Sequence, residues 1–186
     1  MNPAPRKFHR RFAPWLVIPL LVTLMTGVVY RVGRAWFGMG KETGGTILEI
    51  HAGGWLGQTG SVLYVIVVGA GLLGLLATGF YLVLKSRAKG NPRVFHRILG
   101  AVFLLPLTAS AATGIAFKVG EGWLHWPDST LGLLMNIHQG SWLGPQVRPF
   151  YVLAIGFGLL ILAITGLQMT GLFRKKAKKP SAPSAA

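Results

Sequence analysis

The stretch Ile47–Gly57, ILEIHAGGWLG, occurs a second time at Leu134–Gly144 as LMNIHQGSWLG. In both copies an isoleucine, a histidine, a glycine, a tryptophan, a leucine and a glycine keep the same spacing, 87 residues apart. Applied without a gap from residues 8–87 onto 95–174, this offset gives about 28 identities in 80 pairs. Such self-similarity indicates a duplicated chain, with a first repeat at 8–87, a second at 95–174 and a tail at 175–186.

The same offset aligns most of the histidines, which are the candidate metal ligands of the chain. It pairs His9 with His96 and His51 with His138, so four of the five histidines form two matched pairs. His125 stands outside the pattern, because its partner is Gly38. The offset also aligns four Thr-Gly dipeptides, which end at Gly27, Gly114, Gly79 and Gly166.

The composition is that of a membrane protein. Hydrophobic residues make up 52% of the 186 residues and charged residues 12%, with a mean hydropathy of +0.53; the apolar residues fall in long blocks. There is no cysteine, which excludes disulfides, iron–sulfur clusters, zinc–thiolate sites and the covalent attachment of c-type haem. Any metal site must therefore use histidine.

Four apolar runs are long enough to cross a hydrocarbon core of about 30 Å. The first is not followed by a small-x-small cleavage site, so we interpret it as a retained span and not as a signal peptide. The sequence predicts an all-α integral membrane four-helix bundle made of two tandem helical hairpins, followed by a disordered basic tail. The predicted spans are about 12–32, 62–84, 99–117 and 149–173.

The charges predict the orientation. Of the 19 lysines and arginines, 14 fall on the side that holds the chain termini, and all four acids fall on the other. The positive-inside rule then places both termini in the cytoplasm of a multi-pass protein, in the bacterial inner membrane or a related internal membrane. The net charge of +15 is a topology signal and a contact with lipid head groups, so no nucleic-acid partner is expected.

The matched histidines predict two metal sites. His9 and His96 would meet near the cytoplasmic face, and His51 and His138 near the other, because the twofold axis brings each pair to one depth. Two facing imidazoles without a third protein ligand suit the iron of a porphyrin, which supplies four equatorial nitrogens. Zinc or copper would need further ligands. We therefore expect two b-type haems, one per leaflet.

Small and basic neighbours complete the expected sites. Gly27 lies 18 residues after His9, about 27 Å along a helix, and so reaches the depth of the other pair; the four Thr-Gly dipeptides would leave room for a flat ring or serve plain packing. Trp55 and Trp142 are either membrane-belt anchors or cofactor walls. His125 is expected to be an interfacial residue. Candidate partners for haem propionates are Arg10, Arg11, Arg93 and Arg97 on the inner side, and Arg31, Arg34 and Lys118 on the outer.

Two pairs of motifs resemble a known family. The stretches FHRRFAPWLVIPLLVTLMTGVV and FHRILGAVFLLPLTASAATGIA resemble the first helix of the PepSY-associated transmembrane family. The motifs HAGGWLG and HQGSWLG, each followed by a helix that closes on Thr-Gly, are similar to its second-helix motif. The resemblance covers Phe8 to Phe173. It implies a short form of the di-haem ferric-siderophore reductases, with the four paired histidines as axial ligands and connecting loops of about 30 residues in place of the PepSY domains.

Three functions are weighed from these observations. The first is a di-haem electron-transfer protein, either a ferric-reductase-like oxidoreductase or a carrier, supplied by a cytoplasmic flavoprotein, another carrier or quinol because no dinucleotide fingerprint is present. The second is a structural or assembly subunit of a larger membrane complex that binds chlorophyll or another tetrapyrrole. A transporter is disfavoured, because no acidic or amide residue lies inside a span except Gln168.

Overall fold

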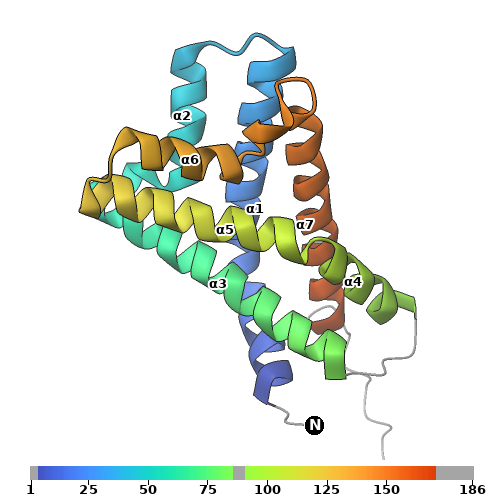
Figure 1. Ribbon diagram of the computed structural model, residues 1–186. Coiled ribbons are helices and arrows are strands. Elements are labelled where there is room, and N and C mark those ends of the chain that lie inside the picture. Colours follow the sequence, from blue (N-terminus) through green and yellow to red (C-terminus); the bar gives the residue numbers. More distant parts are fainter. Residues whose placement is uncertain (1–3, 86–90, 171–186) are drawn as a thin grey trace, which may run out of the picture.

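The computed structural model describes residues 4–85 and 91–170, and within these ranges the chain is helical and contains no strand (Figure 1). The all-α prediction is therefore confirmed. In chain order the elements are α1 (Ala4–Trp36), α2 (Lys41–Ala52), η1 (Gly54–Leu56), α3 (Gly57–Lys85), α4 (Asn91–Val102), α5 (Leu104–Val119), η2 (Gly120–Leu124), α6 (Asp128–His138), η3 (Ser141–Leu143) and α7 (Arg148–Thr170).

Three helical segments are long and apolar enough to cross a membrane, namely α1, Gly54–Lys85 and α7. They contain the predicted spans 12–32 and 62–84 and most of 149–173, whose last three residues lie outside the described ranges. A fourth span exists only if α4 and the segment Leu104–Leu124 are counted together, because they meet at an angle of 57°.

The predicted third span, about 99–117, is thus not one straight helix. Phe103 separates α4 from α5, three residues before Pro106. Proline has no amide hydrogen for the carbonyl one turn earlier and its ring crowds that carbonyl, so a break at this point is expected. In the first half of the chain α1 accommodates both Pro14 and Pro19 without a break.

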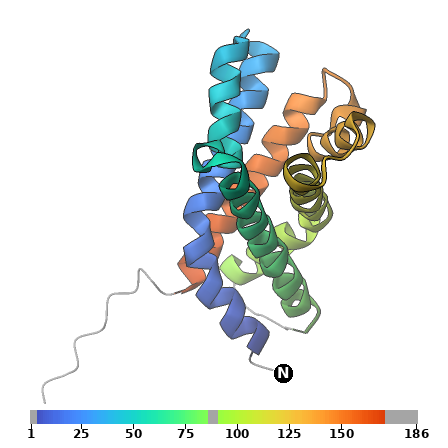
Figure 2. The same cartoon turned by 90° about the vertical axis from the view of Figure 1, so that its left-hand side faces the viewer.

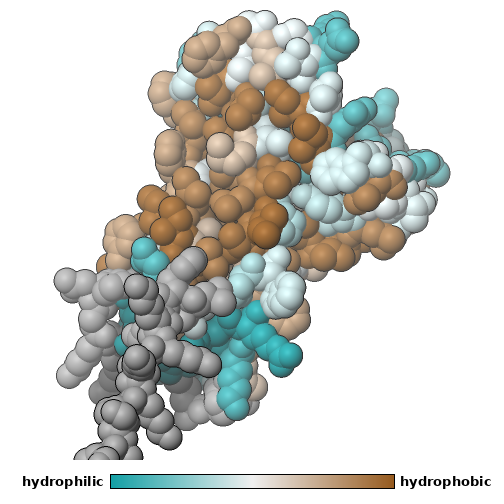
Figure 3. Space-filling model, turned by 180° about the vertical axis from the view of Figure 1, so that it is seen from behind, coloured by the Kyte–Doolittle hydropathy of each residue, from teal (hydrophilic) through white to brown (hydrophobic). Residues whose placement is uncertain are grey.

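The long helices pack in a reciprocal way. Helix α1 lies against α7, and α5 lies against α3, so the first helix of each half contacts the last helix of the other (Figures 1 and 2). The buried apolar cluster among the described residues is small and centres on Leu16, Leu20 and Val68. Large apolar side chains are exposed instead, as at Trp15 and Leu105, which are 81% and 79% exposed. Apolar residues cover much of the face in Figure 3, as expected for contact with lipid.

The segments that connect α1 to α3 and α5 to α7 are themselves largely helical, which corrects the prediction of loops there. Helix α2 folds back along α1, and α6 folds back along α5. Helix α2 contains Gly44 and Gly45 beside two threonines, residue types of low helix propensity, so its sequence gives a weak signal. Each short helix ends beside a histidine of the repeated motif, His51 or His138.

The repeated motif forms the turn that follows each of these histidines. Gly53 ends α2 with φ 70°, η1 follows, and Gly57 enters α3 with φ 74°. In the second half Gly140 and Gly144 repeat this geometry with φ 66° and 85° around η3. Because side chains rarely tolerate these angles, the glycine spacing of the motif is what the turn requires.

His125 occupies a strained turn position, and its replacement by glycine is expected to stabilise the fold. Its φ is 50°, and its counterpart in the first half, Gly38, has φ 62°. A side chain destabilises the folded state at a left-handed position, and glycine removes this cost. The gain exceeds the cost of the greater freedom of glycine in the unfolded chain, so His125→Gly should raise the free energy of unfolding by about 0.5–1 kcal/mol. The thermal midpoint of the protein in detergent measures this. A lower midpoint would show that the imidazole makes a stabilising contact.

Candidate functional site

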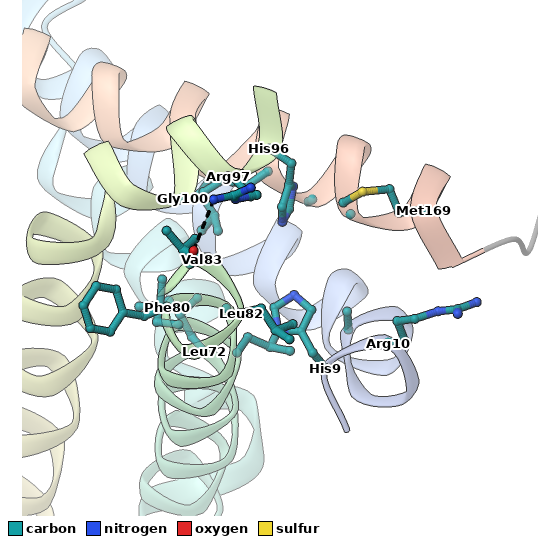
Figure 4. A pocket seen from close by; sticks show the side chains of 18 of the residues that line it. His9, Arg10, Leu72, Phe80, Leu82, Val83, His96, Arg97, Gly100 and Met169 are labelled. Atoms are coloured by element: carbon teal, nitrogen blue, oxygen red, sulfur yellow. Dashed lines mark hydrogen bonds between the residues drawn. The ribbon is translucent and has the colours of Figure 1, made fainter. Parts of the chain in front are cut away.

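The structure brings the four repeated histidines together as two facing pairs. The ring centroids of His9 on α1 and His96 on α4 are 6.4 Å apart, with an interplanar angle of 83°. Those of His51, at the end of α2, and His138, at the end of α6, are also 6.4 Å apart, at 76°. Figure 4 shows His9 and His96 pointing toward one another from their two helices. Both pairs join one residue from each half of the chain.

This separation matches two imidazoles on opposite sides of one metal ion. A metal–imidazole bond is about 2.0–2.1 Å long and a ring nitrogen lies about 1.1 Å from the ring centroid, so trans ligands have centroids about 6.2–6.4 Å apart. The same separation also lies within the range of about 4.5–7 Å over which aromatic rings pack edge to face. The spacing of each pair is compatible with a metal ion between the rings, and the ring distance alone does not distinguish this from edge-to-face packing.

Hydrogen bonds fix the tautomer of the inner pair. The Thr78 hydroxyl donates to the carbonyl of Gly74 at 2.7 Å, so its oxygen is left to accept from Nδ1–H of His9 at 2.9 Å. Thr165 repeats the arrangement: it donates to Ile161 at 2.7 Å and accepts from Nδ1 of His96 at 2.7 Å. With the proton on Nδ1, Nε2 of each ring carries the lone pair that a metal needs.

The outer pair reaches the same tautomer through the backbone. Nδ1 of His51 lies 2.8 Å from the carbonyl oxygen of Thr23, and Nδ1 of His138 lies 2.8 Å from that of Ser110. A carbonyl only accepts, so Nδ1 donates and Nε2 again keeps its lone pair. Burial, with a smaller effect of the facing His138, lowers the pKa of His51 to about 4, and burial lowers the pKa of His138. Both rings are thus neutral at pH 7.

The four glycines of the Thr-Gly dipeptides lie against the imidazoles. A Cβ at Gly27 would stand 3.0 Å from Cε1 of His51, and one at Gly114 would stand 3.0 Å from Cε1 of His138. The corresponding distances at the inner pair are 3.4 Å from Gly79 to His9 and 3.5 Å from Gly166 to His96. The depths predicted from helix spacing are therefore observed. The side chain nearest to each glycine is a histidine ring, whereas the sequence had suggested that a flat cofactor would lie at this place.

A cavity of about 670 Å³ surrounds the inner pair, a size within the range of cofactor sites. Apolar residues of α3 and α7 line it together with arginines of α1 and α4 (Figure 4). Arg10 donates to the carbonyl of Thr170 at 3.0 Å, and Arg97 to that of Val83 at 3.1 Å. Nε of Arg97 is buried without a partner. Arg93 also lines the cavity, whereas Arg11 lies with Arg6, Lys7 and Arg10 in a shallow surface depression.

The predicted cations of the outer side separate into different surroundings. Lys118 forms an ion pair with Glu121 at 2.8 Å, and Arg34 donates to the carbonyl of Met39 at 2.6 Å. Arg31 donates to the side-chain oxygen of Gln139, the residue after His138. Gln139 was not among the residues predicted from the sequence, and neither was Arg148, which interacts electrostatically with Arg31.

The tryptophans of the motif face outward. Trp55 is 58% exposed and packs on Tyr64 with 5.7 Å between ring centroids. Trp142 is 64% exposed and packs on Tyr151 at 6.4 Å. This exposure at the outer turns favours membrane-belt anchors over cofactor walls.

The two histidine pairs lie at different levels of one helix. His9 belongs to α1, and Thr23, whose carbonyl oxygen accepts from His51, lies fourteen residues further along the same helix, or about 21 Å. Within 4–85 and 91–170 no group of three or more metal-binding side chains is present. Each level therefore has two histidines as candidate ligands, which is fewer than a four-ligand zinc site needs and equals the number of protein ligands of a bis-histidine haem.

Comparison of the chain with models of protein families, with curated proteins and with solved structures finds no match. The resemblance to the PepSY-associated transmembrane family therefore depends on the motifs alone. What the site can do has to be argued from its geometry.

Proposed function

We propose that this protein is a membrane electron-transfer protein that holds two b-type haems, one between His9 and His96 and one between His51 and His138. The observation that carries the proposal is the ring separation of 6.4 Å in both pairs, together with hydrogen bonds that leave Nε2 of all four rings free to ligate.

The proposed architecture is a four-helix bundle of two tandem hairpin repeats with both termini in the cytoplasm. The reciprocal packing of α1 on α7 and of α5 on α3 supports the repeat, as do the matched hydrogen bonds of Arg10 to Thr170 and Arg97 to Val83, pairs related by the same offset. The clustering of 14 of 19 basic residues on one side supports the orientation.

Bound haem iron would supply reversible one-electron chemistry at each level. The chain's own part is to hold the imidazoles neutral and oriented and to keep water out with an apolar layer, in which Leu16, Leu20 and Val68 are buried. The two levels, about 21 Å apart, lie within the thickness of one bilayer core. The cytoplasmic face would receive electrons from a soluble carrier or quinol.

The absorbance spectrum of the purified full-length protein tests the proposal. Expression with haem supplied should give a Soret band and, after dithionite, the sharp α and β bands of low-spin bis-histidine haem, with two haems per chain. A colourless protein under these conditions would rule the function out. The alternative of a structural subunit with one histidine per chlorophyll gains no support, because it would leave half of each facing pair without a role.

Thr78→Val is expected to raise the midpoint potential of one haem and leave the other unchanged. The threonine oxygen accepts from Nδ1–H of His9 and so increases the electron donation of that ligand to the iron. Loss of one hydrogen bond of about 0.5–1.5 kcal/mol corresponds to roughly 20–65 mV for one electron. Spectroelectrochemical titration measures the change. Thr78→Ser, which keeps the acceptor, should restore the original value, and an equal shift in both variants would contradict this role.

A further inference from the structure

A group of polar side chains near the outer histidine pair carries positive charge without a matching acid. Arg31 on α1 donates to Gln139 at the end of α6, and the positive charge of Arg148 at the start of α7 acts electrostatically on Arg31. The four acids of the chain all lie within the described residues, and the one ion pair there joins Glu121 to Lys118. We call Arg31, Gln139 and Arg148 the outer arginine cluster.

The cluster is incomplete as it stands. Nε of Arg148 is buried and has no hydrogen-bond partner. Burying a cationic N–H without an acceptor is costly, and the unfavourable electrostatic effect of Arg148 on Arg31 adds to the cost. A bound anion would remove both penalties, because a carboxylate accepts paired hydrogen bonds from guanidinium groups.

The cluster adjoins the level of the outer histidine pair. Gln139 directly follows His138 in the sequence. Arg31 lies four residues beyond Gly27 on α1, or about 6 Å along the helix on nearly the same face, and Gly27 touches the ring of His51. An anionic group attached to the rim of a flat ring between these imidazoles would therefore come within reach of the cluster.

The opposite side of the pair has no such charge. At the 87-residue offset the counterparts of Arg31, Gln139 and Arg148 are Lys118, Ala52 and Ser61. Lys118 is neutralised by Glu121 at 2.8 Å, and the Ser61 hydroxyl donates to the carbonyl of Ala52 at 2.8 Å. The inner level differs, because Arg10 and Arg97 are counterparts and both line its cavity.

We infer that the outer arginine cluster binds the carboxylates of the tetrapyrrole held by His51 and His138, and that it fixes the direction in which the ring is seated. Both propionates of a protoporphyrin project from one edge. Because Lys118 on the other side is already paired with Glu121, that edge faces Arg31 and Arg148. This inference rests on the proposed function and adds the anion site and the orientation.

Titration of the haem-free protein with ferric protoporphyrin IX and with its dimethyl ester tests the inference. The measurements use full-length protein carrying His9→Ala, so that the outer site alone gives a bis-histidine Soret band. Arg31→Gln and Arg148→Gln should each weaken binding of the free acid about ten- to hundredfold, the value of one charge-assisted hydrogen-bond pair. Both should leave binding of the ester unchanged. Lys41→Gln, which removes an exposed positive charge on the same side, should change neither.

The outcomes separate the two proposals. If the starting protein takes up no haem at the outer site, the proposed function fails. If haem binds, but the arginine variants weaken binding of the free acid and of the ester equally or change neither, the inference is wrong and the proposed function stands. If inorganic phosphate stabilises the haem-free protein through these arginines and the acid and ester still bind equally, the cluster serves a free anion and the inference is overturned.

Discussion

His51→Ala is expected to remove one of the two haems and about half of the Soret absorbance per chain. His51 and His138 face each other at 6.4 Å, and no third metal-binding side chain joins them in the described part of the chain. Without His51, a haem at this level would keep one histidine instead of two, whereas loss of a residue that only hydrogen-bonds to a ligand typically costs about 10–100-fold in affinity. The haem content by pyridine haemochrome assay, divided by protein concentration, measures the loss.

The inner haem should remain in this variant. The two levels are about 21 Å apart along α1, and their hydrogen-bond partners are separate residues, Thr23 for His51 and Thr78 for His9. The matched control is His125→Gly, which removes a histidine outside both pairs and should keep two haems. Full haem content in His51→Ala would show that this residue is not a ligand.

Much of the candidate site follows from the duplication. Because the offset matches His9 to His96 and His51 to His138, any twofold arrangement of the halves brings each pair to one level, and the structure has this pairing. The depth of Gly27 beside His51 followed from counting helical residues from His9. These predictions needed only the repeat and the rise of a helix.

Other features depend on tertiary contacts that a single sequence does not reveal. The acceptors for the imidazoles are the Thr78 and Thr165 hydroxyls on the inner level but backbone carbonyls on the outer, and a carbonyl acceptor leaves no trace in residue type. Arg148 was missed because its counterpart, Ser61, has no charge, so the repeat gave no reason to select it.

The break at Phe103 shows where the repeat misled the prediction. Pro19 and Pro106 are counterparts, yet α1 continues through the first and the helix ends before the second. Near the break, the ring of Phe103 fills the space beside Gly158. The counterparts of these residues are Leu16 and Gly71, which also touch one another. The contact of this side chain with a glycine is thus present in both halves. In the second half, where the helix breaks, the side chain is phenylalanine and not leucine.

Gly27→Val is expected to eliminate the outer haem while leaving both of its ligands in the sequence. A Cβ at this position would already stand 3.0 Å from Cε1 of His51 and 3.3 Å from its Nδ1, closer than ordinary contact. The two further methyl groups of valine would force the ring away from its partner, and strain of this kind in a packed interior costs about 1–3 kcal/mol. We therefore expect the haem content to fall to about one per chain, together with a lower thermal midpoint.

Gly45→Val provides the matched control, because a Cβ at Gly45 meets nothing within 4 Å. It makes the same change in α2, the helix that carries His51, and should keep two haems. The comparison separates displacement of the ligand from a general intolerance of valine. Gly27→Val with both haems intact would mean that the His51 ring can move by the width of a side chain and still bind. In that case the contact with Gly27 does not position the ligand, and the conserved Thr-Gly spacing between the two halves would have to be explained by helix packing alone.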